Sequence, residues 1–329
     1  MTALSALRHL LAILRGAGLL PPVPPIFPSF VNSELEAYSA YAGEVGGLAP
    51  ATLISRRQWI GRFLAHSFPA GDIVFSRLEP KAIRDFFTKQ CCGYQPGTSQ
   101  VVASSIRSYF RFRSVRHADP VDAAIAAVPT AARWRLASLP EHLSQAELIQ
   151  LMSAFEKDEP QRQRDYAIMH CLVDLGLRSC EVAALRLDDI DWKNGTLTIR
   201  AGKAKRADVL PLPVITGQAI ANYLRGSRPT TQSRAVFVRH RAPLDAPVDA
   251  CVVRSVVRQA AARSGLAKRL HGPHRLRHSA ATRMLDGGAT LKEIADVLRH
   301  RSLDTTAIYA KVDRTRLNAI AQPWPGVAR

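Results

Sequence analysis

The sequence predicts a mainly α-helical protein of two domains, with a small antiparallel sheet that makes the second domain mixed α/β. Apolar residues recur at helical spacing through most of the 329 residues, and the spacing changes to a period of two between residues 196 and 212. A stretch rich in alanine and proline separates two helical regions. Because the chain is long enough to bury two cores, we expect one domain on each side of that stretch.

The first domain is expected over residues 29–118 as four helices, after an N-terminal arm of residues 1–28. The arm is rich first in leucine and then in proline. Each helix is predicted from apolar side chains that recur every three or four positions. The four sets are Leu35, Tyr38 and Tyr41; Leu53, Ile60, Phe63 and Leu64; Leu78, Ile83, Phe86 and Phe87; and Val101, Ile106, Tyr109 and Phe110.

The balance of charge indicates a polyanionic partner. The chain has 45 Lys and Arg residues against 27 Asp and Glu residues, which gives a formal charge of +18. This excess is costly in self-repulsion unless a polyanion neutralises it, and a merely basic soluble protein is the alternative. Arg107, Arg111 and Arg113 lie on the faces of the fourth helix that the apolar stripe leaves open. They suit contacts with DNA phosphates, although a solvated charged face explains them equally well.

A cytoplasmic protein is expected, without a membrane partner. No segment reaches the roughly 18 to 20 apolar residues that span a bilayer. Arg8 and Arg15 interrupt the leucine-rich start, and prolines follow it without a small-residue cleavage site, which argues against a signal peptide. The five cysteines are odd in number and predict no disulfide framework.

A linker that includes a short helix is expected over residues 119–142, followed by a second domain over residues 143–312 and a tail of residues 313–329. Alanine is frequent in the linker, and three prolines interrupt it. Two capping-box patterns then predict helix starts in the second domain. They are Ser144 with Glu147 and Thr290 with Glu293.

The change to a period of two predicts a hairpin of strands over residues 196–200 and 208–212. Lys203 lies at its tip, where a long, flexible ammonium group can reach a groove and donate a proton. Most lysines in turns are simply solvated, and Lys205 or Arg206 could serve nearly as well.

The segment from Pro273 to His278 is the strongest local indication of a binding site. Pro273 favours the first position of a helix, so His274 lies in the first turn, where backbone N–H groups and the helix dipole attract an anion. Arg277 shares a face with His274, so both could meet one phosphate. The alternative is a metal bound by His274 and His278. No metal is expected, because the metalloprotease glutamate is missing between them and no cysteine is near.

Three further residues gain significance from their company. Arg178 follows a glycine turn at Gly176, with Glu181 three residues later; alone, it would be a surface residue or part of a helix-start salt bridge. His300 ends the last capped helix, and Tyr309 follows nine residues later. A tyrosine in a helix is most often a core residue. Together with Lys203, His274 and Arg277, these side chains supply phosphate binding, proton transfer and a nucleophile.

Together these segments resemble the tyrosine recombinases of the lambda-integrase type, which include phage and integron integrases and the Xer resolvases. The resemblance covers nearly the whole chain from about Phe30 and rests on four motifs in order. The family usually has glycine where Arg299 stands, and usually places a second lysine and an arginine further along the hairpin. The motifs are Gly176-Leu177-Arg178 with Glu181; Gly202-Lys203 before Leu210-Pro211-Leu212; His274-Arg275-Leu276-Arg277-His278; and Leu298-Arg299-His300 before Thr305, Thr306 and Tyr309.

The resemblance implies a SAM-like core-binding first domain and a catalytic second domain. Tyr309 would attack a DNA phosphate, form a 3′-phosphotyrosine and free a 5′-hydroxyl. Because the phosphotyrosine keeps the bond energy, neither a metal nor ATP nor another cofactor is expected. The other implied roles are phosphate binding by Arg178, Arg277 and His300 with support from Glu181, protonation of the leaving oxygen by Lys203, and general base catalysis by His274.

The resemblance also implies a homo-tetramer on a double-stranded DNA recombination site, with the need for an accessory recombination protein left open. The tail has a short apolar pattern in Leu317, Ile320 and Trp324, and it is expected to dock on a neighbouring subunit. Further DNA-binding candidates are Lys205, Arg206 and Arg275.

Two other functions remain open from the sequence. One is a type IB topoisomerase, which nicks and reseals one strand without exchanging partners. The other is an accessory protein that binds DNA without cleaving it. The complete set of six residues argues against the second, because a chain without catalysis has no physical reason to keep them all.

Overall fold

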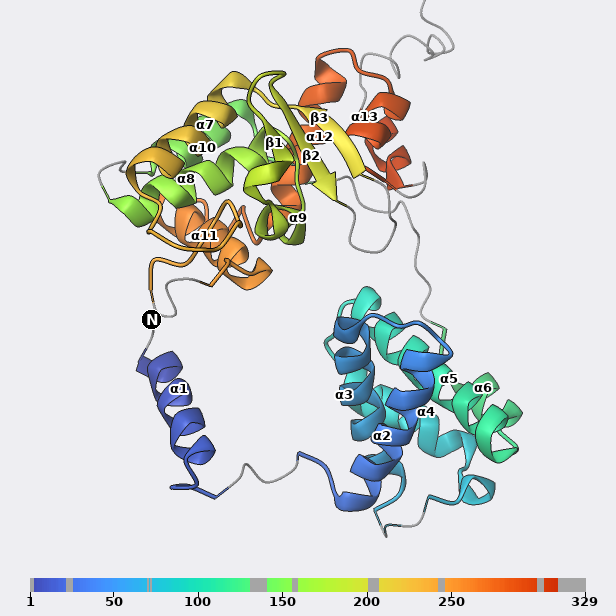
Figure 1. Cartoon of the computed structure of the whole chain (residues 1–329). Helices are drawn as coiled ribbons and strands as arrows, with labels where there is room; N and C mark the ends of the chain where they lie inside the picture. The colour runs from blue at the N-terminus through green and yellow to red at the C-terminus, as the bar shows by residue number, and fades with distance from the viewer. Residues whose placement is uncertain are drawn as a thin grey trace, which may run out of the picture. The chain divides into compact units, whose positions relative to one another are not determined.

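The computed structural model describes residues 3–21, 26–69, 71, 73–130, 141–155, 159–200, 207–241, 246–300 and 305–312. The chain divides into two compact units, Met1–Arg135 and Leu136–Arg329. Both are mainly helical, and the second contains the sheet (Figure 1). The predicted fold class is therefore confirmed. Part of the expected linker, residues 131–140, lies outside the described residues.

The first unit contains the four expected helices. Proline stands at the start of three of them, where its missing N–H costs no hydrogen bond. The short α6 (Asp122–Ala127) is the helix expected in the linker, and α1 (Ala3–Gly16) lies in the arm, where the sequence pattern predicts no element. The four are α2 (Ser29–Glu44), α3 (Pro50–Ser67), α4 (Pro80–Cys91) and α5 (Pro96–His117), with the 3-10 turn η1 (Phe75–Arg77) before α4.

Aromatic side chains fill the core of the first unit. Phe63 of α3 packs edge-on against Phe86 of α4 and Phe110 of α5, with ring centroids 5.3 and 5.6 Å apart. Tyr38 of α2 meets Tyr109 of α5 at 6.0 Å. Such large side chains supply much of the apolar burial that stabilises a small helical bundle. α6 packs against α4 and α5, so the start of the expected linker belongs to this core.

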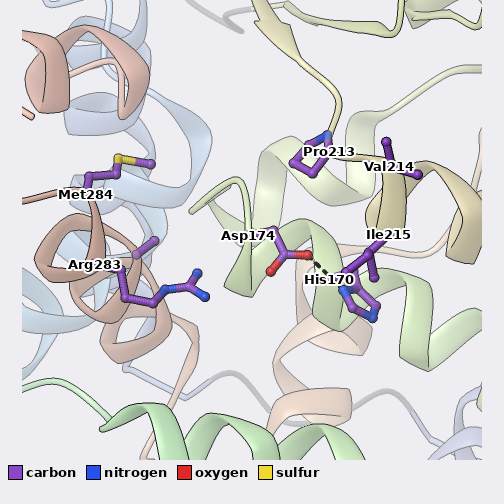
Figure 2. A pocket seen from close by; sticks show the side chains of 8 residues that line it. His170, Asp174, Pro213, Val214, Ile215, Arg283 and Met284 are labelled. Carbon is purple, nitrogen blue, oxygen red and sulfur yellow. Dashed lines mark hydrogen bonds and ion pairs between the residues drawn. The ribbon is translucent and has the colours of Figure 1, made fainter. Parts of the chain in front are cut away.

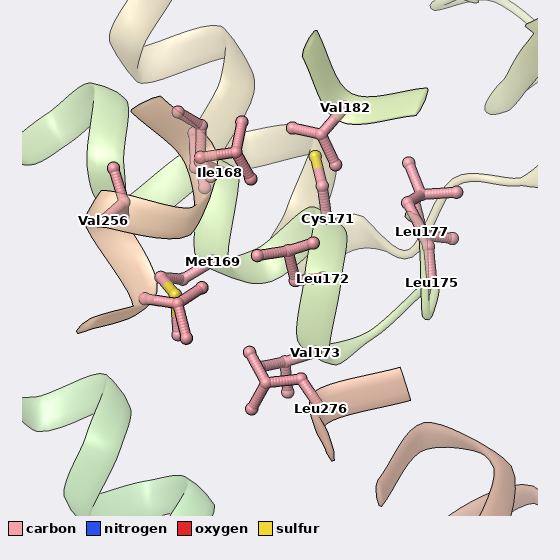
Figure 3. Packing of buried hydrophobic residues seen from close by; sticks show 14 of the residues in the cluster. Ile168, Met169, Cys171, Leu172, Val173, Leu175, Leu177, Val182, Val256 and Leu276 are labelled. Atoms are coloured by element: carbon pink, nitrogen blue, oxygen red, sulfur yellow. The ribbon is translucent and has the colours of Figure 1, made fainter. Parts of the chain in front are cut away.

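The second unit surrounds a central helix, α8 (Pro160–Val173). Nine of its 14 residues are buried, as is typical of a helix covered on all sides. Figure 3 shows Ile168 and Leu172 of α8 among side chains from other elements, including Val182, Val256 and Leu276. The helices packed on it are α7 (Gln145–Ser153), α9 (Ser179–Ala184), α10 (Val214–Gly226), α11 (Ala250–Arg263) and α12 (Pro273–Asp286); α13 (Leu291–Val297) and the 3-10 helix η4 (Ala307–Val312) follow α12.

The sheet of the second unit has three antiparallel strands in chain order. β2 (Thr196–Arg200) and β3 (Ala207–Pro211) are the two predicted strands. β1 (Ile190–Asp191), which follows the 3-10 turn η2 (Leu187–Asp189), adds a short edge. Leu197 pairs with Ile190 on one side and with Leu210 on the other, and all three are buried. This alternation of buried side chains explains the period of two.

Local signals predict the helix starts correctly. Ser144 Oγ accepts the Glu147 backbone N–H at 3.2 Å, and Thr290 Oγ1 accepts that of Glu293 at the same distance. Both pairs are complete capping boxes. α12 begins at Pro273, as expected. Within the described ranges, no helix is both long and apolar enough to cross a membrane.

Candidate active site

Arg277 of α12 is a buried arginine, with 3% of its surface exposed. Its guanidinium donates to the carbonyl oxygen of Gly176 at 2.6 Å and to that of Leu298. It therefore ties α12 to the turn after α8 and to the end of α13. Burial, together with the nearby Arg178, lowers the pKa of Arg277 to about 10, so it stays charged at neutral pH.

Gly176 makes the turn that receives this contact. Its φ of +60° lies in the left-handed region that favours glycine. A Cβ atom here would lie 2.7 Å from Leu298 Cδ2 and 3.3 Å from Ala280 Cβ. Glycine is therefore required for both conformation and space, and the turn brings Arg178 to the same place as Arg277.

Arg178 directly precedes α9, and 41% of its side chain is exposed. Its Nη1 donates to Glu181 Oε1 at 2.7 Å, and its backbone N–H donates to Glu181 Oε2 at 2.7 Å. Nη2 donates to the carbonyl oxygen of Arg299 at 3.2 Å. The guanidinium is thus oriented from one side and open to solvent on the other.

Glu181 also binds a further arginine, Arg299. Arg299 Nη2 donates to Glu181 Oε2 at 2.7 Å, and its side chain is 7% exposed. Burial raises the pKa of Glu181, but Arg299 and Arg178 outweigh burial and hold this pKa below its ordinary value. Arg277 lies within electrostatic range of the same carboxylate, so three guanidiniums share one negative charge, and the excess positive charge attracts an anion.

A pocket of about 250 Å³ opens beside these groups. Arg178, His274 and Arg277 line it, together with Cys180 and Arg254. The structure therefore brings together three of the predicted site residues from separate parts of the chain. Two guanidiniums and an imidazole match the hydrogen-bond acceptors of a phosphate group.

His274 lies in the first turn of α12, as expected. Partial burial of its ring, with Arg277 and Arg178 nearby, lowers its pKa. The ring packs edge-on against that of His278, with centroids 4.7 Å apart. His274 thus lines the pocket and also contacts a second imidazole.

Tyr309 binds His278, whose spacing from His274 in the sequence suggested a role only as an alternative metal ligand. The Tyr309 hydroxyl lies 2.7 Å from His278 Nδ1. Tyr309 is 1% exposed, and burial raises its pKa to about 12. Burial, with His274 nearby, lowers the pKa of His278 to about 4. At neutral pH the phenol is therefore protonated and the imidazole is neutral, so the phenol can donate to it.

The sequence contains one indication that His278 belongs to the site. It lies four residues after His274, and residues four apart lie on one helix face. In the described ranges, no group of three or more His, Cys, Asp or Glu side chains could hold a metal ion.

His300 is held by one of the two threonines in the last motif. Its Nδ1 lies 2.7 Å from the hydroxyl of Thr306, which is fully buried. Burial lowers the pKa of His300 to about 4, and the positive charges of Arg277 and Arg178 contribute. His300 is therefore a neutral imidazole within the electrostatic influence of the arginine cluster.

Two of the DNA-binding candidates, Arg107 and Arg113, make contacts within the first unit. Arg107 donates to the carbonyl oxygen of Val128 at 2.8 Å. Arg113 pairs with Glu34 at 2.9 Å and with Asp119 at 2.7 Å. These contacts explain both arginines as stabilisers of the fold, whereas Arg111 on the same helix is exposed.

Of the remaining candidates, the structure describes Arg275 but not the residues of the hairpin tip. Arg275 of α12 pairs with Glu141, which leaves 15% of its side chain exposed. The hairpin tip with Lys203, Lys205 and Arg206 lies outside the described residues, so the position of the catalytic lysine stays a prediction.

A larger cavity of about 570 Å³ lies against α8, α10 and α12, apart from the predicted site residues (Figure 2). Asp174 accepts hydrogen bonds from His170 Nδ1 and Thr216 Oγ1, both at 2.8 Å. Another part of the cavity wall is apolar, and it includes Val214 and Ile215, which are 73% and 61% exposed. The cavity therefore has both a polar and an apolar part.

The chain matches known proteins in sequence and in fold. Residues 141–316 match the family described as the phage integrase family. The integrase/recombinase named y4rA of Sinorhizobium fredii is 39% identical over 327 residues, which are 99% of this chain and 79% of that protein. Tyrosine recombinase XerA of Pyrococcus furiosus is 28% identical over 283 residues, 86% and 91% of the two chains. Lambda integrase, in a tetramer bound to a Holliday junction, shares the fold with a TM-score of 0.63 at 18% identity, over 83% of this chain and 77% of that one.

Proposed function

The chain belongs to the phage integrase family of tyrosine recombinases, enzymes that bind DNA and carry out site-specific recombination, and on this premise we propose which residues perform the reaction. The observation that carries the proposal is the convergence of Arg178, Arg277 and His274 on one pocket. In this pocket a DNA phosphate would accept hydrogen bonds from both guanidiniums, which would stabilise the charge that develops as the phosphorus becomes five-coordinate.

Tyr309 is the proposed nucleophile. Its phenolic oxygen would attack the phosphorus, form the 3′-phosphotyrosine and release the 5′-oxygen, which would take a proton from Lys203. Because the pKa of Tyr309 is about 12, the attack needs a base, and the hydrogen-bonded group in this structure is His278. We therefore assign proton acceptance to His278, whereas the family resemblance assigns it to His274. Since Tyr309 is 1% exposed, its hydroxyl must also become accessible before attack.

His300 and Glu181 have supporting roles in this proposal. His300, neutral and fixed by Thr306, would donate a hydrogen bond to the phosphate from its other ring nitrogen. Glu181 would orient Arg178 through its two short contacts. The energy of the broken bond is kept in the phosphotyrosine, so the reaction is proposed to need neither metal nor ATP.

We also propose that the chain acts as a homo-tetramer on DNA, because exchange of strands between two duplexes requires cleavage on both. The first domain, residues 29–118, would hold the duplex together with the catalytic domain, residues 143–312. The tail, residues 313–329, lies outside the described residues and is proposed to dock on a neighbouring subunit. The exposed apolar wall at Val214 and Ile215 supports this proposal, because it can receive the apolar residues of a neighbour's tail.

The proposal is tested with nicked suicide substrates drawn from the DNA that flanks the gene, without metal or ATP. We expect wild type to form SDS-resistant protein–DNA adducts and Tyr309→Phe to form none. Tyr223→Phe is the matched control, because Tyr223 is also a fully buried tyrosine of the second unit and its hydroxyl lies near the backbone N–H of Val238. Adducts with Tyr309→Phe would contradict the assignment of the nucleophile.

Two related activities are separated by the products. Relaxation of supercoiled DNA without recombinant products would favour a topoisomerase-like reaction. Tight binding without adducts on any fragment would favour an accessory role. Among the described residues, no specific contact favours either activity.

A further inference from the structure

Arg299 occupies a backbone position that favours glycine. Its φ is +52°, in the left-handed region. The backbone N–H of His300 donates to Ala295 O at 2.9 Å, and that of Arg299 donates to Asp296 O at 3.0 Å. This pair of hydrogen bonds is a Schellman motif at the end of α13, in which the left-handed residue is usually glycine. An arginine at this position carries a conformational cost that glycine would avoid.

The side chain of Arg299 turns inward onto the arginine cluster. Its Nη2 binds Glu181 Oε2 at 2.7 Å, and its Nη1 donates to Val297 O at 2.8 Å. Its own carbonyl oxygen accepts Arg178 Nη2 at 3.2 Å. One residue therefore touches both members of the Arg178–Glu181 pair.

The contact divides the carboxylate of Glu181 between two arginines. With Arg299 in place, Glu181 Oε2 is bound by the Arg299 guanidinium and by the Arg178 backbone, which leaves Oε1 for the Arg178 guanidinium. Without Arg299, the whole carboxylate charge would be available to Arg178. An arginine that is neutralised by its own partner is a weaker ligand for an incoming phosphate.

We propose that Arg299 is a positioning residue for the cleavage reaction: it shares Glu181, so that Arg178 is held in place yet keeps its charge for the DNA phosphate. This inference rests on the proposed function of Arg178. It assigns a role to an arginine whose backbone conformation favours glycine.

Arg299→Gly tests the proposal, because glycine suits the backbone and removes only the side chain. Relief of the positive φ and loss of the ion pair with Glu181 act in opposite directions, so we expect a melting temperature close to that of wild type and DNA affinity within about twofold. We expect the single-turnover rate of adduct formation on saturating suicide substrate to fall about tenfold. Arg299→Lys, which keeps the charge, should recover part of that rate. The matched control is Ala118→Gly, at the other non-glycine residue with positive φ in the described ranges, which should leave the rate unchanged.

A double variant identifies the route of the effect. If Arg299 acts through Glu181, the rate of Arg299→Gly with Glu181→Gln should equal that of Glu181→Gln alone. Multiplication of the two single effects, or wild-type cleavage by Arg299→Gly, would overturn the inference while leaving the proposed function intact. A wild-type protein that makes no adduct would overturn the proposed function and the inference with it.

Discussion

Burial lowers the pKa values of several side chains in the site, but it leaves the histidines neutral and the arginine charged at neutral pH. His278 and His300 are kept neutral, each with a pKa of about 4, because burial and nearby positive charge disfavour their protonation. Arg277 stays charged even though burial lowers its pKa to about 10. Neutral imidazoles beside charged guanidiniums combine proton acceptance with phosphate binding, which is what the proposed reaction requires.

The proton acceptor of Tyr309 can be tested by substitution of His278. In His278→Gln we expect adduct formation to slow by about 100-fold or more, because the pKa of the phenol is far above neutral pH. The measurement is single-turnover cleavage with DNA affinity as a second readout, and the affinity should change little. His240→Gln is the matched control, since burial also lowers the pKa of His240 to about 4 and it lies against Tyr223 instead of Tyr309. Wild-type cleavage by His278→Gln would return the role to His274.

The same histidines predict how stability depends on pH. In the unfolded chain they titrate near pH 6.5, whereas in the folded chain they titrate near 4. Between these values the unfolded state binds more protons, so the free energy of unfolding should fall as the pH drops from about 6.5 toward 4. Urea unfolding at about pH 7 and about pH 5 measures this difference, and it should shrink in His278→Gln. A protein that becomes more stable over this acid range would contradict the assigned states.

At the scale of elements, the site is built where helix ends meet. The turn after α8, the starts of α9 and α12 and the end of α13 each contribute one part of it. Capping boxes and the proline at α12 are local signals, so the sequence predicts these starts. The two-residue strand β1 has too short a pattern to be predicted. The contact between His278 and Tyr309 joins residues 31 apart, and no local pattern reports it.

The turn at Gly176 is predicted to be the element most sensitive to a small change. In Gly176→Ala the Cβ would meet Leu298 Cδ2 at 2.7 Å, and positive φ adds strain. We expect a loss of about 1 to 3 kcal/mol in the free energy of unfolding, together with slower cleavage, because the carbonyl that holds Arg277 moves.

Gly195→Ala is the matched control for this prediction. Gly195 has a φ of +61°, nearly that of Gly176, but a Cβ there would meet nothing within 4 Å. It should therefore show the strain alone and cleave normally. Equal effects of the two substitutions on urea unfolding and cleavage would exclude the packing argument.

For the whole molecule, composition predicts the class of partner, and periodicity predicts the helical units. The charge of +18 and the fourth-helix arginines indicate DNA, yet the individual contacts could not be read from the pattern. Arg113 looks like a surface arginine in the sequence, but it binds Glu34, 79 residues away. Long-range partners of this kind decide which charges remain available to a ligand.

The dependence of DNA binding on salt tests this view of the charge. If several phosphates are contacted, affinity should fall by about 10³-fold or more between about 50 and 200 mM salt. Fluorescence anisotropy measures the slope of log affinity against log salt concentration. Arg111→Gln should reduce the magnitude of this slope by about one, because Arg111 is exposed. Arg113→Gln should instead lower stability, since Arg113 is bound within the fold. Affinity that is insensitive to salt would contradict the electrostatic account.

The most direct test of the central claim is the location of the covalent bond. The adduct trapped with wild-type protein would be digested with nuclease and protease, and the modified peptide would be identified by mass spectrometry. We predict a nucleotide joined through its 3′-phosphate to Tyr309. A nucleotide on any other residue, or a peptide with Tyr309 unmodified in an intact adduct, would contradict the account.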